Sequence, residues 1–151
     1  METCILTLDP FEAARALAEF TYRAQGCGAV ASFTGLMRPA NRYGASVSAL
    51  SLHVHPRLTL PSMQAVHDDA MDQFDIRAAH IVHRHGTILP NEAIVFVAAA
   101  SAHRRAAFDA VDCMMDSLKT QAMFWKREDG EGGSAWIEPT AADYSDRARW
   151  T

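Results

Sequence analysis

The sequence feature that most constrains the fold is an uninterrupted apolar segment at residues 93–100, AIVFVAAA. A strand that is apolar at every position suits the centre of a sheet, where both of its faces are covered. We therefore predict a buried, central strand at this place in the chain.

Shorter segments are expected to form the strands that neighbour it in the sheet. Turn signals alternate with runs typical of strands at residues 4–8, 29–34, 47–54, 80–84 and 135–138. Strands and helices follow one another without regular βαβ alternation, which indicates an α+β fold with a mixed, mainly antiparallel sheet. The chain has 151 residues, the length of one typical domain, so we expect residues 1–151 to form a single domain.

Three main helices are expected. The first has Asp9 as its N-cap, Pro10 at the first helical position and Glu12 as a capping-box acid. The second covers about residues 56–74, and the third and longest begins at residue 102. The residues expected on the buried faces of the second and third helices are Leu60, Met63, Val66, Ala70 and Phe74, and Phe108, Val111, Met115, Leu118 and Ala122.

Composition excludes several classes of protein. No stretch approaches the ~20 apolar residues that cross a bilayer, and the N-terminus lacks a secretion signal, so we expect a cytoplasmic protein. A net charge of -4 argues against a broad nucleic-acid surface, which needs a basic face. Cys4, Cys27 and Cys113 are far apart and odd in number, so we expect neither a disulfide framework nor a cysteine metal site.

Two kinds of segment are candidates for function. Residues 36–46 are rich in turn-forming residues and contain two arginines, so we predict a lid that is carried on a rigid scaffold. The pairs His53 with His55, and His83 with His85, would each lie on one face of a strand and could hold a metal ion. No carboxylate or cysteine has matching spacing beside them, so we expect no metal site.

The two lysines have the strongest case for chemistry. Lys119 borders the apolar face of the third helix, and Lys126 follows seven residues later. If helical geometry persists past Ala122, both ammonium groups lie on one side of the helix, where their mutual repulsion and partial burial favour the neutral amine. A lysine in this state can act as a base or nucleophile. Spacing alone leaves a second interpretation open, in which both are solvated cations near the helix C-terminus.

The order of several short motifs resembles one protein family from Gly28 to Trp150. The motifs are Phe33-Thr34-Gly35 with Arg38, His83-Arg84 with Gly86, Glu92, Ser101 with His103-Arg104, Asp116 with Leu118-Lys119, and Trp125-Lys126-Arg127-Glu128. Together they resemble the large, catalytic subunit of molybdopterin synthase. This resemblance implies an α/β-hammerhead-like fold and a sulfurtransferase activity.

The resemblance also implies partners and a substrate. Two large subunits form a central dimer, and a ubiquitin-like small subunit at each end presents a C-terminal Gly-Gly thiocarboxylate. Sulfur passes from this thiocarboxylate to cyclic pyranopterin monophosphate and leaves the dithiolene of molybdopterin, without a metal or other cofactor. A different class of function stays open: a non-catalytic dimeric module that binds a phosphorylated metabolite or a ubiquitin-like partner.

The site residues implied by the resemblance fall into two groups. Lys119 is the principal catalytic lysine, and Lys126 assists it in proton transfer or charge stabilisation. The residues expected to bind substrate are Met37, Arg38, His103, Arg104, Arg127 and Glu128. His103 and Lys119 lie at opposite ends of one predicted helix, about 24 Å apart at the rise of an α-helix. We therefore expect composite sites, with His103 and Arg104 from one protomer and Lys119, Lys126 and Arg38 from the other.

Four positions depart from the family's pattern. Leu36 stands where a basic residue is frequent, and His53 stands where a glutamate is usual. Met123 replaces a proline, which predicts a longer helix before Lys126. Thr140 stands where some relatives have an arginine, so one phosphate contact is expected to be missing.

Overall fold

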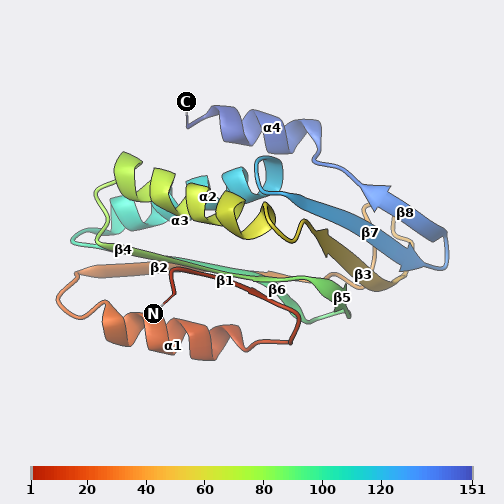
Figure 1. Ribbon diagram of the computed structural model, residues 1–151, viewed down its shortest axis with the longest axis horizontal. Coiled ribbons are helices and arrows are strands. Elements are labelled where there is room, and N and C mark those ends of the chain that lie inside the picture. Colours follow the sequence, from red (N-terminus) through yellow and green to blue (C-terminus); the bar gives the residue numbers. More distant parts are fainter. Residues whose placement is uncertain (1, 151) are drawn as a thin grey trace.

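The computed structural model describes residues 2–150, in which a four-stranded sheet lies between helices on both faces (Figure 1). Helix α1 covers one face, α2 and α3 cover the other, and α4 lies over α3 on the outside (Figure 1). The strands of this first sheet, in spatial order, are β1 (Cys4–Thr7), β4 (Ala78–Arg84), β6 (Ala93–Ser101) and β2 (Ala29–Leu36). The helices are α1 (Ala13–Arg23), α2 (Thr59–Gln73), α3 (Arg104–Thr120) and α4 (Ala141–Ala148).

Strand β6 is the central strand that its apolar sequence predicts. It pairs antiparallel with both β4 and β2, while β1 adds to β4 in parallel. Because side chains alternate along a strand, Val95, Val97 and Ala99 pack toward α2 and α3, while Phe96 and Ala98 pack toward α1. The predicted α+β fold with a mixed, mainly antiparallel sheet is therefore confirmed, with four helices in the described residues instead of three.

A second four-stranded sheet extends from one end of the first (Figure 1). Its strands, in spatial order, are β5 (Gly86–Ile88), β3 (Val47–Val54), β7 (Phe124–Gly130) and β8 (Gly133–Ile137), and every pairing is antiparallel. One face packs on the first sheet's end through a cluster of Met37, Val47, Leu50, Leu52 and Ile88. The sequence pattern predicted β3 and most of β8, and it missed β5 and β7.

The expectation of a longer third helix is wrong. Helix α3 ends at Thr120, and the next three residues turn into β7. Two hydrogen bonds from α2 fix this turn: the Thr59 hydroxyl donates to the Met123 carbonyl at 2.6 Å, and the Met123 N–H donates to Ser62 Oγ at 3.0 Å. Met123 therefore does not prolong the helix. Its N–H takes part in a bond that a proline could not make.

The buried faces of the helices also differ from the expected ones. Leu60 and Phe108 were expected in the core, but they are 45% and 57% exposed. The buried side of α3 carries Ala107, Ala110 and Met114, because small alanines let the helix approach the sheet closely. The N-cap of α1 is Glu12 and not Asp9, and no side chain caps this helix. Helix α4, which was not among the three expected helices, has a complete capping box.

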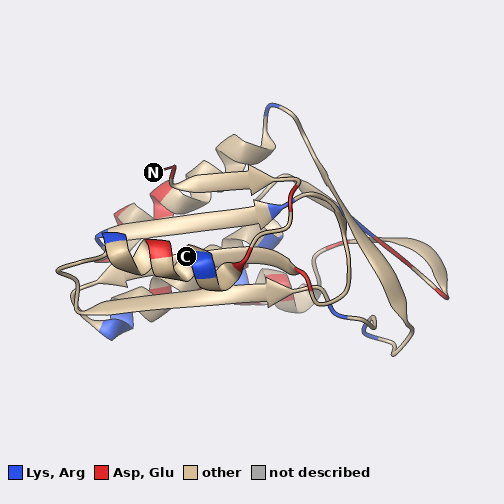
Figure 2. Cartoon of the chain, turned by 90° about the horizontal axis from the view of Figure 1, so that it is seen from below, with Lys and Arg blue, Asp and Glu red and all other residues tan. Residues whose placement is uncertain are grey.

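Charged residues of both signs are interspersed along the helices and loops (Figure 2). No helix within residues 2–150 has the length and apolar character needed to span a membrane.

The central strand gives a direct test of the packing. Phe96 is 1% exposed between the sheet and α1, so Phe96→Ala is expected to lower the free energy of unfolding by about 3–5 kcal/mol. Phe33, on the neighbouring strand, is 44% exposed, so Phe33→Ala is expected to cost about 1 kcal/mol or less. Urea unfolding of both variants measures the difference. Equal losses would show that β6 is not the buried centre of the sheet.

Candidate functional site

The only two lysines of the sequence meet where α3 ends and β7 begins. They are two of the 14 residues counted as Lys or Arg, so the other basic side chains of this count are arginines. Arginine stays protonated in proteins, whereas a buried lysine loses its proton readily. The titratable amine side chains of the chain are therefore concentrated in one place.

Lys119, in the last turn of α3, forms an ion pair with a carboxylate of α4. Its side chain is 50% exposed, and its Nζ lies 3.4 Å from Oδ1 of Asp143. The Thr140 N–H donates to Oδ2 of Asp143 at 2.8 Å, and the Asp143 N–H donates to the Thr140 hydroxyl at 3.1 Å. This reciprocal capping box fixes the carboxylate at the start of α4. Thr140, a departure from the family's pattern, thus has a structural role here.

Lys126 lies on the inward face of β7, opposite Leu52 of β3 and Ile137 of β8. Burial lowers the pKa of Lys126, and the nearby Lys119 ammonium lowers it further, while the carboxylates of Asp143 and Glu128 act in the opposite direction. The charge of Lys119 thus acts on Lys126, as the spacing of the two lysines led us to expect, and their catalytic roles stay predictions. The predicted cause was wrong, because a strand that turns back beside α3 brings them together and not a continuous helix.

A neutral histidine lies next to this pair. His83 stacks on Phe124, with ring centroids 4.1 Å apart, and its Nδ1 lies 2.8 Å from the Arg84 carbonyl oxygen. Burial lowers the pKa of His83 to about 4, an effect that the Arg84 hydrogen bond opposes and the positive charge of Lys126 reinforces. His85 follows the end of β4, so it does not continue that strand. Within residues 2–150, no cluster of three or more His, Cys, Asp or Glu side chains has the arrangement of a metal site.

The two residues after Lys126 point to opposite sides of the strand. Glu128 shares the inward face with Lys126. Arg127 lies on the outward face, with Nε 3.3 Å from Asp129 Oδ1 and its guanidinium over the ring of Trp136. Within one chain, Glu128 therefore lies on the same face of β7 as Lys126 and Arg127 lies on the opposite face, and the substrate-binding roles of both stay predictions.

The loop that contains Met37 and Arg38 is anchored to the end of the first sheet. Met37 is 4% exposed; its N–H donates to the Glu92 carbonyl at 2.9 Å, and its carbonyl accepts from the Asn91 N–H at 2.8 Å. The buried Arg84 guanidinium lies 3.7 Å from the Glu92 carboxylate below it. Met37 thus holds the loop in place and offers little free surface within one chain, and its substrate-binding role stays a prediction. Arg38 is exposed, and its binding role and that of the lid stay predictions.

The other end of α3 forms a basic pocket of about 500 Å³. It is lined by Gly28, Ala29, Ala102, His103, Arg104 and Arg105. No side chain caps the helix, so its first N–H groups and positive dipole end suit an anion such as a phosphate. A Cβ at Gly28 would collide with the Ala102 carbonyl oxygen, which explains the glycine. Arg105 was not among the predicted substrate-binding residues, although it lies beside two of them in the sequence.

The structure therefore brings Lys119, Lys126 and Glu128 together, and it places His103 and Arg104 at the far end of α3. His103 and Lys119 are thus at opposite ends of α3 within one chain, as the helical rise predicted. A composite site would need a second protomer and stays a prediction.

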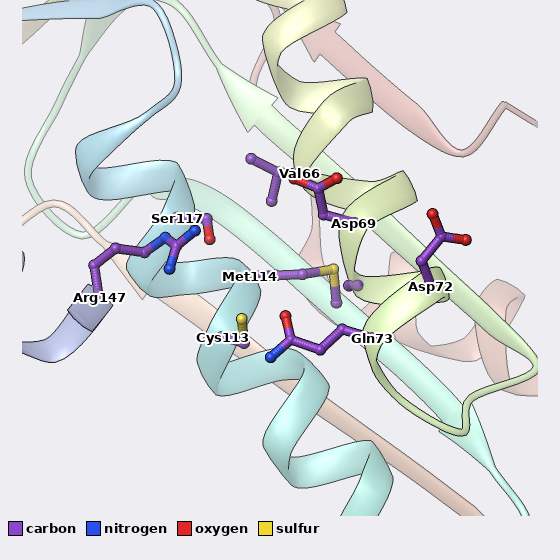
Figure 3. A pocket seen from close by; sticks show the side chains of 9 residues that line it. Val66, Asp69, Asp72, Gln73, Cys113, Met114, Ser117 and Arg147 are labelled. Carbon is purple, nitrogen blue, oxygen red and sulfur yellow. The ribbon is translucent and has the colours of Figure 1, made fainter. Parts of the chain in front are cut away.

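A further cavity of about 280 Å³ lies between α2, α3 and α4 (Figure 3). Arg147 of α4 points toward Ser117 and Cys113 of α3, and neither lysine lines this space (Figure 3). Burial raises the pKa of the Cys113 thiol, which disfavours a reactive thiolate. The residues around this cavity therefore form a junction between helices and are separate from the lysine pair.

An α+β domain with paired lysines at one end of a helix and an anion pocket at the other has the features of an enzyme that acts on an anionic substrate. The chain belongs to the MoaE protein family, whose sequence model matches residues 6–121.

Similar proteins cover almost the whole chain. A molybdopterin synthase catalytic subunit of Caulobacter vibrioides is 46% identical over 145 residues, which are 96% of this chain and 95% of that protein. The protein of the same name from Escherichia coli is 41% identical and covers 82% of this chain and 81% of its own length. A solved structure of a molybdopterin biosynthesis MoaE protein from Burkholderia ambifaria is 33% identical, with a TM-score of 0.82 over 99% of this chain and 98% of that one.

His83 leads to a prediction about stability and pH. Its pKa lies at about 4 in the folded protein and at 6.5 ordinarily, so between these values the unfolded chain binds a proton that the folded chain does not. Lowering the pH through this window therefore destabilises the fold, by about 1.4 kcal/mol per pH unit for one such group. His83→Gln is expected to remove this contribution. Urea unfolding between pH 4 and 8 measures it, and an unchanged slope in the variant would contradict the assignment.

Above pH 7, His83 is neutral in both states. The stability difference between the wild type and His83→Gln should therefore be independent of pH there, which provides an internal control.

Proposed function

We propose that this chain is a cytoplasmic molybdopterin synthase catalytic subunit. It transfers sulfur from the C-terminal thiocarboxylate of a ubiquitin-like small subunit to cyclic pyranopterin monophosphate, and the product is the dithiolene of molybdopterin. Membership of the MoaE family and the names of its relatives support this assignment. The observation that carries it is the lysine pair, because its chemistry fits the reaction.

The reaction requires both a positive charge and a proton acceptor. In each round, the carbon–sulfur bond of the donor breaks, and a new carbon–sulfur bond replaces a carbon–oxygen bond of the pterin side chain, whose oxygen leaves with the phosphate as its ring opens or as water. Water attacks the acyl carbon, so the donor leaves as a carboxylate and a proton is released. An ammonium stabilises the oxyanion that develops at the acyl carbon, and a neutral amine accepts the proton.

Lys119 is the principal catalytic lysine at the thiocarboxylate end, and Lys126 assists it. The phosphate and the pterin are bound by Arg38, His103 and Arg104, with the open helix end at His103 favouring the phosphate. Because His103 lies at the far end of α3 from Lys119, each active site takes these two residues from different protomers of a homodimer.

A non-catalytic module that only binds a phosphorylated metabolite or a ubiquitin-like partner is the competing proposal. The burial of Lys126 favours the enzyme, because a lowered pKa weakens a simple anion-binding lysine. The same lowered pKa improves a lysine that must release and accept protons near neutral pH.

The first test removes the principal lysine. Lys119→Ala is expected to lower the rate of sulfur transfer by about a hundredfold or more, because the oxyanion loses its cation. Affinity for the small subunit should stay within about twofold, because the rest of a typical protein interface is unchanged. The measurement uses thiocarboxylated small subunit and cyclic pyranopterin monophosphate, with calorimetry for binding.

Arg15→Ala is a suitable control, since Arg15 forms only an exposed pair with Glu19 on α1. Unchanged turnover in Lys119→Ala would eliminate the catalytic role of this lysine.

The composite site gives a second test by subunit mixing. Lys119→Ala and His103→Ala homodimers each have no intact site, whereas a mixed dimer would have one site with both wild-type residues. Unfolding, mixing and refolding the two inactive variants should therefore restore activity, up to about a quarter of the wild-type value for random pairing. No recovery in verified mixed dimers would mean that one chain supplies the whole site.

A further inference from the structure

The ion pair between Asp143 and Lys119 makes the two lysines unequal. The Asp143 carboxylate lies 3.4 Å from Lys119 Nζ, and its other oxygen accepts the Thr140 N–H. Lys126 forms no ion pair within 4.0 Å among the described residues 2–150, and it lies on β7 between its register partners Leu52 of β3 and Ile137 of β8. A carboxylate is therefore in contact with one amine and only near the other.

The hydrogen bonds with Thr140 hold the Asp143 carboxylate in place independently of Lys119. Burial alone would raise the pKa of Asp143, but the Thr140 hydrogen bonds and the Lys119 ammonium outweigh burial and lower it. Helix α4, which carries Asp143, has no buried residue of its own and is fixed to α3 by polar contacts. Trp150 Nε1 donates to Asp116 Oδ2 at 2.7 Å, and Arg149 Nη2 donates to the same oxygen at 3.0 Å.

Four charged or titratable groups influence Lys126 from the elements packed around it. These are Lys119 of α3, Asp143 of α4, Glu128 of β7 and His83 of β4. His83 is neutral above pH 7. The effect of these four groups on the pKa of Lys126 therefore comes from one ammonium and two carboxylates. Among these carboxylates, only Asp143 also contacts Lys119.

We propose that Asp143 is a positioning residue of the lysine pair, which holds the Lys119 ammonium in place beside Lys126, while Lys126 exchanges a proton with the substrate. Lys119 then supplies the positive charge at the acyl carbon, and Lys126 takes the proton released by water. This division of roles rests on the proposed sulfur transfer, but the state of each amine can be measured without it.

Isotopic labelling tests the proposal directly, because the full chain contains only two lysines. Protein labelled with ¹³C and ¹⁵N in lysine gives two side-chain signals, which Lys119→Arg and Lys126→Arg assign. In the wild type, the Lys126 signal is expected to titrate at a lower pH than an ordinary lysine, because burial and the Lys119 charge lower its pKa. In Asp143→Asn, the Lys126 midpoint should move to a still lower pH, because a carboxylate that favours its charged form is gone.

Two variants separate charge from fold. Asp143→Glu keeps the charge and a capping-box acid, so it should keep the Lys126 midpoint near the wild-type value. Asp112→Asn makes the same chemical change at another contact between α3 and α4, where Asp112 accepts from Arg149, and should leave the midpoint unchanged. A midpoint that does not move in Asp143→Asn overturns the proposal. The same shift in Asp112→Asn would also overturn it, since docking of α4 would then be the cause.

Kinetics provide the second readout in the reconstituted enzyme. Asp143→Asn is expected to lower kcat about tenfold, the rate equivalent of one charge-assisted hydrogen bond, with KM for the donor within about twofold. The acidic limb of its kcat profile should move to lower pH, and Asp143→Glu should restore it. Wild-type protein that transfers no sulfur would refute the proposed function. An active wild type with an unmoved profile in Asp143→Asn would refute only the role of Asp143.

Discussion

The site depends on how α2 holds the segment that follows α3. The hydroxyls of Thr59 and Ser62 bind the Met123 carbonyl and N–H, so the chain leaves α3 in a fixed direction and enters β7 beside β3. Lys126 consequently returns to the end of the helix that carries Lys119. If the chain continued straight away from α3 as a strand, the two amines would not meet, because seven residues of strand extend well beyond the reach of a lysine side chain.

Sequence patterns predicted those parts of the fold that depend on local periodicity. The apolar segment gave the central strand β6, and the steps of three and four gave α3. The pattern failed for β7, because its charged residues suit a solvated surface and only pairing with β3 makes it a strand. It also failed for Leu60 and Phe108, because alanines, which carry little hydrophobic signal, form much of the buried side of α3.

The candidate site was predictable in its residue types and less so in its geometry. Both lysines and the basic start of α3 were identified from the sequence. The sequence could not show that Arg127 points away from Lys126, since that follows from strand alternation, nor that Met37 is buried. Asp143 was also missed, because it lies 24 residues after its partner and the intervening hairpin had been assigned incorrectly.

The scarcity of lysine has a consequence for the proposed reaction. An activated acyl donor can be attacked by any free amine, and such aminolysis would join the donor permanently to the protein. Away from the two lysines, this chain carries its positive side chains as guanidinium groups, which are poor nucleophiles because they stay protonated. Lysine side chains are thus confined to the proposed reaction site, and the rest of the surface has no lysine that could react with the acyl group.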